Sequence, residues 1–512
     1  MTDETDQQKA VIGFLRNPAS HGGAEVEEVV THASHLFMAG DRVYKLKRAV
    51  HYPFLDYSTV QKRRVACERE VSLNRRTAPS LYLEVASIGG DDGRLGWGGD
   101  PVRDHVVVMN RFDQDGLFDR RAEAGTLDAA DLEGLADSVR RFHGGLPAIE
   151  PVPDWPASFG WVIDDNREEL HELASWRRRD LAGFDRWTAG ARAAGGPLLA
   201  ERSAAVRLCH GDLHLRNVVM LDGRPTPFDG IEFDDTIATI DPLYDIAFLM
   251  MDLAHRRLDG HASRFLSRYL FPATGEAWRD EPSLWRGLAL LDLYLTQRAS
   301  VRAKTALAGG DGDDPEHRRE ADGYLDLALA IADRAPPVLV AVGGLSGTGK
   351  TTLAHALLEE PALPAGTVHL RSDVIRKRLF GAGDDDRLPE EAYAPEVGRH
   401  VFALMGELAG RVLGAGRPVV VDGVYAQAEE RQAIAAMARE RGADFRPLWL
   451  DGPESLRLER VGGRRGDASD ADAAVVRRQS DYDLGRLDWP RIAADGPIAA
   501  VRARAVEALG FS

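Results

Sequence analysis

The order of apolar and polar residues predicts a strand-rich beginning and a helix-rich middle of the chain. Two short apolar runs flank the Gly40 turn in HLFMAGDRVYKLKR, which predicts a β-hairpin. Val65–Arg76 has a helical pattern, whereas Tyr82–Ile88 and Val106–Met109 are strand-like. After Leu127 the pattern is mostly helical. We therefore expect a small sheet-rich lobe followed by a larger helical lobe.

A second change of pattern lies near residues 309–337. Gly309–Asp322 is polar and rich in turn residues, which predicts a surface loop, and Tyr324–Arg334 carries apolar residues at helical spacing. Two prolines end that helix, and the apolar run Val338–Val342 then predicts a buried parallel strand. We place a domain boundary near Ala335, which gives domains at 1–335 and 336–512.

Length and composition agree with more than one soluble domain. The chain has 512 residues, of which 44% are hydrophobic and 28% charged. Its 64 basic and 81 acidic side chains give a formal net charge of −17. Residues 336–512 carry 23 basic and 26 acidic side chains, a charge of −3, so residues 1–335 carry −14. This balance argues against general binding to nucleic acid or to an anionic membrane.

Cysteine usage and the apolar runs indicate a cytoplasmic protein. The two cysteines, Cys67 and Cys209, are too few for a disulfide framework and lack C-x-x-C metal spacing. The sequence MTDETDQQKA is acidic and polar, unlike a signal peptide. The longest apolar stretch, near Pro336–Gly344, is about half as long as a membrane span requires. We expect no membrane association.

The first group of chemistry-bearing residues lies in CHGDLHLRNVVM and PFDGIEFDD. Asp212 and Asn217 are five residues apart in a loop, and Asp229 follows. Phosphoryl transfer needs a carboxylate to orient the attacking hydroxyl and hard oxygen ligands for Mg²⁺. Asp212 fits the first role, and Asn217 and Asp229 fit the second. Glu232 is an alternative to Asp229 as the second metal ligand.

These motifs resemble a known family. HGDLHLRN, FDGIEFDD and DPLYDIAF are similar, in that order, to the aminoglycoside phosphotransferase and choline kinase group. The Asp-x-x-x-x-Asn spacing also matches the catalytic loop of protein kinases, whose bilobal fold this group shares. The resemblance covers roughly residues 30–330. It implies an α+β bilobal kinase-like domain that uses ATP and Mg²⁺.

The resemblance assigns roles in the sheet-rich lobe. It makes Lys45 the strand lysine that holds the ATP phosphates, with Lys47 as the alternative, since both point to one face of a strand. It makes Glu70 the helix glutamate that pairs with this lysine, with Glu68 second. Met109–Arg111 would lie beside the adenine.

Five further residues qualify this picture. The turn over the phosphates has only Gly40, and Arg216 stands where the group often has a small residue, which would change the substrate side of the pocket. We expect His210 to brace the catalytic loop and Cys209 to be a buried packing residue. His214 is either exposed to solvent or in contact with substrate.

The second group is a P-loop in VLVAVGGLSGTGKTTLAHALL. It has the pattern G-x-x-x-x-G-K-T between a predicted strand and a predicted helix. Backbone N–H groups of such a loop and the helix N-terminus bind phosphates. The lysine reaches the β/γ-phosphates, and the threonine hydroxyl binds Mg²⁺. The residues expected to bind nucleotide are Gly344, Gly347, Gly349, Lys350, Thr351 and Thr352.

Downstream residues indicate a kinase rather than a motor ATPase. Asp373-x-x-Arg376 follows a short strand-like run, and the apolar run PVVVDGVY contains Asp422. Arg460, Arg464 and Arg465 lie in or near a polar segment from which an arginine could close on the transferring phosphate. Asp373 could instead serve only as a helix N-cap. Arg465 could instead be a solvated side chain without a catalytic role.

Residues 336–500 resemble small P-loop kinases such as gluconate kinase, chloramphenicol phosphotransferase, zeta-toxin-like kinases and polynucleotide 5′-kinases. The resemblance implies an α/β domain with a parallel sheet. It makes Asp373 the base, Arg376 a substrate ligand and Arg464 the lid arginine. Asp422 would hold Mg²⁺ through water.

The sequence thus predicts two kinase-like sites on one chain, each moving the ATP γ-phosphate to a hydroxyl of a small molecule. Two alternatives stay open. In the first alternative, one domain is a nucleotide-sensing regulator of the other. In the second, the P-loop domain phosphorylates nucleic-acid 5′ ends, which its charge of −3 permits.

Overall fold

The computed structural model describes residues 2–52, 55–91, 94–272, 282–308, 314–463 and 468–511. They form two compact units. Unit 1 comprises Met1–Leu127, Arg141–Ile149 and Val206–Asp245, and unit 2 comprises Asp128–Arg140, Glu150–Ala205 and Ile246–Ser512. Helices α4 (Ala129–Gly144) and α8 (Pro242–His255) contain residues of both.

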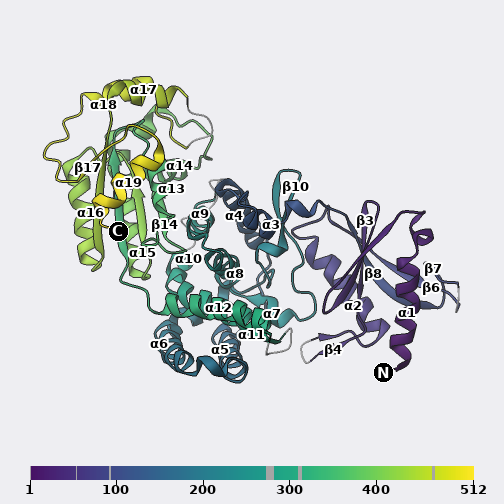
Figure 1. Ribbon diagram of the computed structural model, residues 1–512. Helices are drawn as coiled ribbons and strands as arrows, with labels where there is room; N and C mark the ends of the chain where they lie inside the picture. The colour runs from purple at the N-terminus through teal and green to yellow at the C-terminus, as the bar shows by residue number, and fades with distance from the viewer. Residues whose placement is uncertain are drawn as a thin grey trace. The chain divides into compact units, whose positions relative to one another are not determined.

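Unit 1 is built on an antiparallel six-stranded sheet of order β1-β2-β3-β8-β6-β7 (Figure 1). The strands are β1 (Val26–Val30), β2 (Ser34–Ala39), β3 (Arg42–Lys47), β6 (Tyr82–Gly89), β7 (Gly96–Trp97) and β8 (Val102–Asn110). β2 and β3 pair across Gly40 as predicted. Smaller elements are β4 (His51–Tyr52), β5 (Leu55–Asp56), α3 (Phe118–Glu123), β9 (Arg207–Leu208), β10 (Val218–Leu221), β11 (Arg224–Pro227), α7 (Asp235–Ala238) and β12 (Thr239–Ile240).

Alternating side chains of this sheet bury both of its faces. Phe37 packs with Val11 and Leu15 of α1 (Thr2–Arg16), whereas its neighbour Met38 packs with Val71 of α2 (Val60–Asn74). The two-residue period of a strand therefore places one helix on each face. This arrangement fixes α2, which carries Glu70, against the sheet whose strand β3 carries both lysines.

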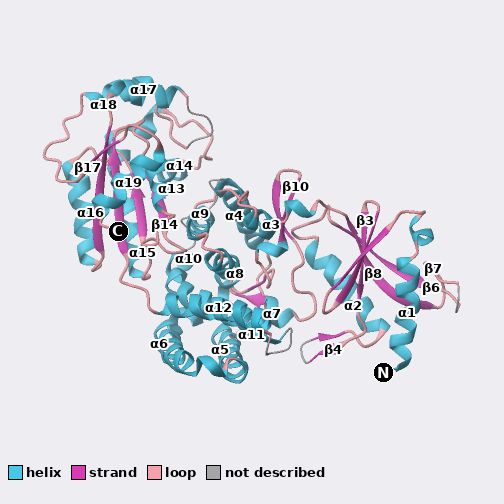
Figure 2. Ribbon diagram, viewed as in Figure 1, coloured by secondary structure: helices cyan, strands magenta, loops and turns pink. Residues whose placement is uncertain are grey.

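Unit 2 contains helices from the middle of the chain and a parallel sheet from its C-terminal part. The helices are α5 (Trp155–Leu173), α6 (Arg178–Arg202), α9 (Asp259–Leu270), α10 (Pro282–Gly287), α11 (Leu291–Ala308) and α12 (Pro315–Ala332). Figure 2 shows that helix dominates this middle region, as the sequence pattern predicts. The described residues include no helix long and apolar enough to cross a bilayer.

One expectation is wrong. Residues 315–322 were expected in a surface loop, but they form the first turns of α12. Asp314 caps that helix by accepting a hydrogen bond from Glu316 N, and Pro315 occupies its first turn, so the helix starts within the polar stretch. Residues 309–313 lie outside the described residues.

The five-stranded sheet is parallel throughout, with order β14-β15-β13-β16-β17. Its strands are β13 (Val338–Gly344), β14 (Val368–Arg371), β15 (Val419–Asp422), β16 (Asp444–Asp451) and β17 (Arg491–Ala493). The helices between and after them are α13 (Lys350–Leu357), α14 (Ser372–Leu379), α15 (Pro395–Gly414), α16 (Ala428–Glu440), α17 (Glu454–Gly462), α18 (Ala473–Ser480) and α19 (Ile498–Leu509).

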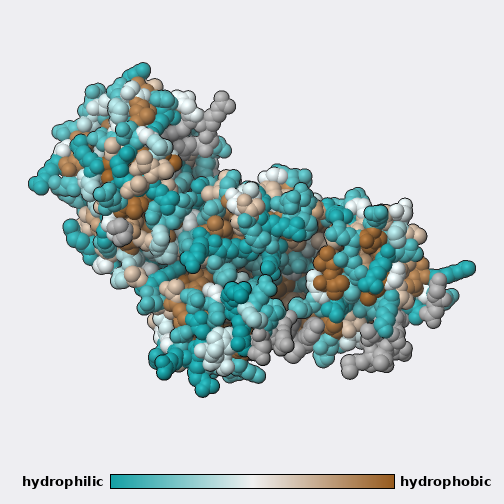
Figure 3. All heavy atoms as spheres, viewed as in Figure 1, coloured by the Kyte–Doolittle hydropathy of each residue, from teal (hydrophilic) through white to brown (hydrophobic). Residues whose placement is uncertain are grey.

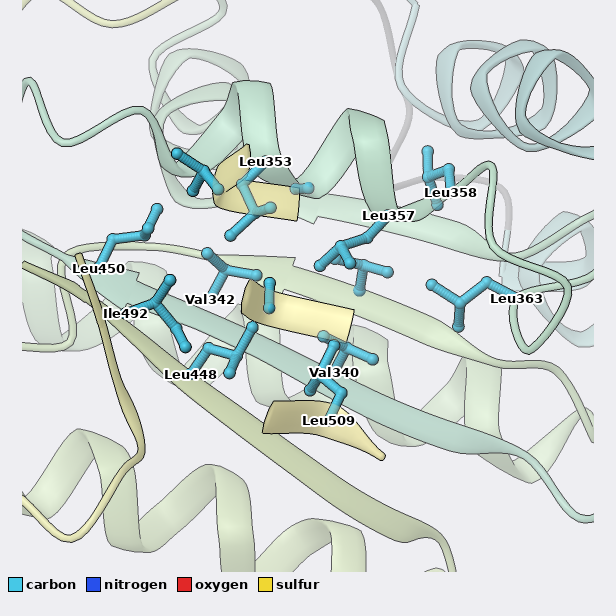
Figure 4. Close-up of a cluster of buried hydrophobic side chains, with 14 of the residues drawn as sticks. Val340, Val342, Leu353, Leu357, Leu358, Leu363, Leu448, Leu450, Ile492 and Leu509 are labelled. Carbon is cyan, nitrogen blue, oxygen red and sulfur yellow. The ribbon is translucent and has the colours of Figure 1, made fainter. Parts of the chain in front are cut away.

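An apolar core fixes the central strand of this sheet. Every residue of β13 is buried, as expected for a parallel strand covered on both faces. Figure 4 shows Val340 and Val342 with Leu353 and Leu357 of α13, in a cluster that also includes Leu509. In contrast, Figure 3 shows a surface that is mostly hydrophilic on the face in view. The buried packing sets the position of the loop between β13 and α13.

Candidate functional sites

Two lysines share one glutamate in unit 1. Lys45 and Lys47 of β3 point to the same face, and α2 presents Glu70 to them. Lys45 Nζ lies 2.8 Å from Glu70 Oε1, and Lys47 Nζ lies 2.6 Å from Glu70 Oε2. Burial alone would raise the pKa of Glu70, but the two ammonium groups outweigh burial and lower that pKa. Glu68 is half exposed and pairs with Arg64, so Glu70 is the glutamate in contact with both lysines.

The two lysines differ in their second carboxylate partner. Lys45 Nζ donates to Asp229 Oδ1 at 2.6 Å, whereas Lys47 Nζ donates to Glu232. The Tyr57 hydroxyl also donates to Glu232, at 2.7 Å. Burial lowers the pKa of each lysine, but the neighbouring carboxylates outweigh it and raise both values. Asp229 is 41% exposed and Glu232 only 10%, so Asp229 is the more accessible carboxylate.

The catalytic-loop residues lie next to this cluster. Asn217 Nδ2 donates to Asp212 Oδ2 at 2.9 Å and approaches the Asp229 carbonyl oxygen at 3.5 Å. His214 Nε2 lies 3.3 Å from Asp212 Oδ2, and the Asp212 side chain is 36% exposed. The structure therefore brings together Asp212, Asn217 and Asp229, and leaves both carboxylates open to solvent.

Buried hydrogen bonds brace this loop. Asp245 accepts from His210 N at 3.1 Å and from Gly211 N at 2.9 Å, and His143 Nε2 lies 3.0 Å from its carboxylate. His210 Nε2 lies 3.0 Å from the Phe228 carbonyl oxygen, which confirms the expected bracing role. Burial lowers the pKa of His210 and so favours its neutral form. These bonds account for the close approach of His143 and Asp245, and we assign no metal to them.

Asp229 sits in a constrained backbone conformation. Its φ of 59° lies in the left-handed region, which is costly for a residue other than glycine. Asp229 N donates to the Tyr82 hydroxyl at 3.1 Å, and Gly230 N donates to Asn74 Oδ1 at 2.7 Å. Because Asn74 ends α2, the helix that carries Glu70 also holds the segment that carries Asp229.

Two residues singled out earlier have simpler surroundings. Arg216 is 61% exposed, and its Nε lies 3.7 Å from Asp119 Oδ2. Cys209 is buried, as expected, and Cys67 is buried too. In the Met109–Arg111 segment, Arg111 N donates to the Asp41 carbonyl oxygen at 2.9 Å.

The P-loop of unit 2 follows β13 and depends on its glycines. Gly344, Gly347 and Gly349 all have positive φ. A Cβ atom on Gly347 would lie 2.5 Å from the Arg457 carbonyl oxygen, and one on Gly344 would lie 2.7 Å from the Leu450 carbonyl oxygen. Only glycine permits both the conformation and the close approach. The loop therefore curves as a phosphate-binding loop requires.

The P-loop and the predicted base line one cavity of about 560 Å³. Lys350, Thr351 and Thr352 lie in its wall, and so does Asp373 at the start of α14. This volume suits a small-molecule site. Ser346 N is already bonded to the Gln479 side chain at 2.7 Å, so the protein itself occupies one N–H group of the loop.

Asp373 and Arg376 lie on one face of α14, three residues apart. The N-cap of this helix is Arg371, so Asp373 is inside the first turn and does not cap the helix. Arg376 donates to the Ala392 carbonyl oxygen at 2.6 Å, and its guanidinium lies 5.1 Å from the centre of the Tyr393 ring. These contacts hold the Arg376 side chain against Ala392 and Tyr393.

Asp422 ends β15 directly beside β13, opposite Val342. Its carboxylate is buried and lies 2.8 Å from His369 Nε2 on β14. Burial would raise the pKa of Asp422, but the hydrogen bond and charge of His369 outweigh it and lower the pKa. Asp422 is thus an ionised carboxylate near the P-loop.

The arginines at the end of α17 and just after it divide into two groups. Arg460 donates to the Thr348 carbonyl oxygen at 2.9 Å and to the Ala494 carbonyl oxygen at 2.8 Å, so it ties the P-loop to the segment after β17, and it also lines the cavity. Arg464 and Arg465 lie outside the described residues. The lid role of Arg464 remains a prediction.

Sequence reasoning missed several supporting residues. Asn74, Tyr57 and Tyr82 hold the first site, and His369 holds the second. Only Asn74 had a usable signal, because it ends the helix that carries Glu70. Tyr82 and His369 are far in sequence from the groups they contact, and so is Tyr57 from Glu232.

Comparison with known families agrees with this geometry. The model described as "Phosphotransferase enzyme family" matches residues 60–282, and the model described as "AAA domain" matches residues 339–482. The chain is a tandem fusion of a phosphotransferase-family domain and a P-loop kinase domain. It is a kinase-type enzyme, as the sequence motifs predict.

Similarity to other proteins extends over nearly the whole chain. Uncharacterized proteins of Mycobacterium tuberculosis and Mycobacterium bovis are each 28% identical over 479 residues, which cover 90% of this chain and 91% of theirs. A solved choline/ethanolamine kinase family protein from Mesorhizobium loti is 15% identical, with a TM-score of 0.39 over 64% of this chain and 95% of its own. A gluconokinase from Sinorhizobium meliloti is 23% identical, with a TM-score of 0.25 over 35% of this chain and 94% of its own.

Proposed function

We propose that this fusion is a bifunctional cytoplasmic kinase, with one site in residues 1–335 and one in 336–512. Each site would transfer the γ-phosphate of ATP to a hydroxyl of a small molecule, with Mg²⁺. The observation that carries the proposal is that each site combines a lysine for phosphates with oxygen ligands for a metal and an acidic group for the acceptor. Both sets support phosphoryl transfer.

The charge balance of the first site fits magnesium. Three carboxylates, of Glu70, Asp229 and Glu232, face the two ammonium groups of Lys45 and Lys47, which leaves one negative charge in excess. Glu232 is held by Lys47 and Tyr57, so the exposed Asp229 is the better metal ligand.

Each residue of the first site then has one role. Lys45 holds the α- and β-phosphates, and Glu70 orients it. Asn217 turns its Nδ2 toward Asp212, which leaves its Oδ1 to bind Mg²⁺ beside Asp229. Asp212 orients the acceptor hydroxyl and takes its proton.

The second site divides the same tasks differently. Backbone N–H groups of the glycine loop, Lys350 and the threonines hold the phosphates of ATP, and the Thr351 hydroxyl binds Mg²⁺. Asp422 orients water around the metal. Asp373 takes the proton of the acceptor hydroxyl, and Arg376 holds the acceptor. ATP with Mg²⁺ supplies the transferable phosphoryl group at both sites.

Transfer of label from γ-labelled ATP into a bacterial metabolite extract tests the proposal. Wild type, Asp212→Ala and Asp373→Ala would be compared, with products identified by mass. We expect each variant to lose a different product. If one variant loses every product, only that site is catalytic and the other is a sensor or scaffold. Labelling of an added 5′-hydroxyl oligonucleotide instead would replace the small-molecule acceptor of the second site.

A further inference from the structure

Helix α9 of the phosphotransferase-family segment packs against an edge strand of the P-loop segment, within unit 2. β14 is the end strand of the parallel sheet, and α9 lies beside it (Figure 1). His369 N of β14 donates to Ser267 Oγ of α9 at 2.9 Å. Ala365 N, just before β14, donates to Asp259 Oδ1 at 2.9 Å. The helix therefore takes up backbone donors that an uncovered edge would leave to solvent.

The first line of contacts runs from α9 to Asp422. The Ser267 hydroxyl donates to the Ser263 carbonyl oxygen at 2.7 Å, so its lone pairs are directed to His369 N. The ring of the same His369 lies 2.8 Å from Asp422. His369 thus contacts α9 through its backbone N–H and Asp422, the carboxylate proposed to act at the metal, through its side chain.

The second line runs from α9 to α14. Arg268 forms two hydrogen bonds with Asp137 of α4, of 2.9 and 2.8 Å, and a third with Asp384. Asp384 in turn accepts from Arg378 at 2.5 Å, and its carbonyl oxygen accepts from Lys377 at 2.5 Å. Both of these cations are buried on α14.

These cations follow directly after the proposed base and substrate ligand on α14. Arg378 and Lys377 are only 3% and 1% exposed. Because water cannot solvate these buried cations, α14 depends on their protein partners. Asp384 has a lowered pKa because the charges of Arg268 and Arg378 outweigh its burial. Movement of Asp384 would therefore shift the helix that presents Asp373.

A third contact lies just before β14 and β15 in the chain. Asp292 of α11 accepts from Arg417 Nη1 at 2.6 Å, and Arg417 also donates to the Gly366 carbonyl oxygen at 2.8 Å. Arg417 is 1% exposed and precedes β15. Two helices that precede the P-loop segment, α9 and α11, thus hold β14 and β15.

We propose that Ser267 and Arg268 are positioning residues for the P-loop site. They fix the acceptor side of that site, Asp373 and Arg376 on α14 and Asp422 on β15, while the P-loop itself is held by its own sheet. The P-loop domain then works at full rate only with the helices of its fused partner in place. This inference rests on the roles proposed above for Asp373 and Asp422.

Turnover in the full-length chain tests the proposal. ATP would serve as phosphoryl donor and water as acceptor, in an Asp212→Ala background that silences the first site. We expect Arg268→Gln to lower turnover on the order of 10- to 100-fold, as loss of a supporting contact does. ADP affinity should stay at the wild-type value, because the P-loop is untouched. Arg268→Lys, which keeps the charge, should recover part of the rate.

Arg264→Gln is the matched control. Arg264 lies on the same helix and pairs with Glu133 of α4 at 2.6 Å, whereas Arg268 is the residue of α9 that pairs with Asp384. It should retain wild-type turnover. Asp384→Asn should reproduce the Arg268→Gln defect, and the double variant should be no slower than either single variant. Equal losses in Arg264→Gln and Arg268→Gln, or additive losses in the double variant, would overturn the proposal.

Hydrogen exchange gives a readout that does not depend on activity. Arg268→Gln should speed amide exchange across residues 372–386, and Ser267→Ala should speed it at His369, with Arg264→Gln unchanged. Unaltered exchange in both test variants would refute the coupling. If wild-type turnover survives Lys350→Ala, the proposed function of the second site fails instead, and exchange alone decides whether α9 holds β14 and α14.

Discussion

Lys47 Nζ lies 2.6 Å from Glu70 Oε2, and the two side chains are only 1% and 0% exposed. Lys45 contacts the other oxygen of the same carboxylate but is 13% exposed and also reaches Asp229. A phosphate group can approach only the more accessible lysine. We therefore propose that Lys45 is the lysine that binds ATP and that Lys47 supports Glu70.

The two lysines should respond differently to removal. Lys45→Ala should reduce phosphotransfer at the first site by about 10²-fold, because it removes a preorganised positive charge. Lys47→Ala should lower the free energy of unfolding by about 3–5 kcal/mol, because it leaves buried carboxylates unpaired. Product formation and urea unfolding measure the two effects.

Lys62→Ala is the control for these lysines. Lys62 is 48% exposed and pairs with Asp56 at the surface, so this variant should match wild type in both assays. A stable, inactive Lys47→Ala together with an active Lys45→Ala would reverse the assignment.

Gly347→Ala should disable the second site. A methyl group there would lie 2.5 Å from the Arg457 carbonyl oxygen, and the φ of 85° is itself unfavourable for alanine. We expect nucleotide affinity at this site to fall by at least about tenfold, since the strained loop would shift. Calorimetric titration with ADP measures it. Gly462→Ala, in α17 with open space around it, should bind ADP as wild type does.

Asp422→Asn should raise the Mg²⁺ concentration needed for half-maximal turnover at the second site. The amide keeps the shape but removes the charge beside the P-loop, and such losses cost on the order of 10- to 100-fold in metal affinity. Magnesium titration of turnover measures the change. Asp451 ends the neighbouring strand β16 and is 53% exposed, so Asp451→Asn is the control. Identical titrations of all three proteins would exclude a metal role for Asp422.

Glu430 should make stability depend on pH. Burial raises its pKa from 4.5 to about 7, so the folded protein binds this proton more tightly than the unfolded chain does. The resulting stability is present at low pH and is lost as pH rises from about 4.5 to 7. Glu430→Gln cannot ionise and should melt at a higher temperature than wild type at pH 8, with a smaller difference at pH 4.5.

Melting curves across this range, followed by circular dichroism, provide the measurement. The glutamine retains an acceptor for Gln427 N, which Glu430 now bonds at 3.3 Å at the start of α16. Glu429→Gln, at the exposed neighbouring position, should follow wild type. A constant difference between Glu430→Gln and wild type at all pH values would contradict the argument.

The sequence by itself determined the elements whose signals are local. The P-loop needs only a buried strand, three glycines and a helix in succession, so contiguous residues specify it. Asp212 and Asn217 likewise share one short loop. Both fold classes followed from these motifs and from the spacing of apolar residues. The first turns of α12 were not predicted, because Asp314, which caps the helix, is surrounded by other polar residues in the sequence.

Tertiary structure decided between residues with equal local patterns. Lys45 and Lys47 share a strand face, and only the packing of α2 and the Asp229 segment shows which one is accessible. Asp229 and Glu232 differ in the same way, through contacts with β3 more than 180 positions earlier. The link from Arg268 to Asp384 spans 116 positions and has no sequence signal. Such contacts depend on how whole elements pack, which local patterns do not encode.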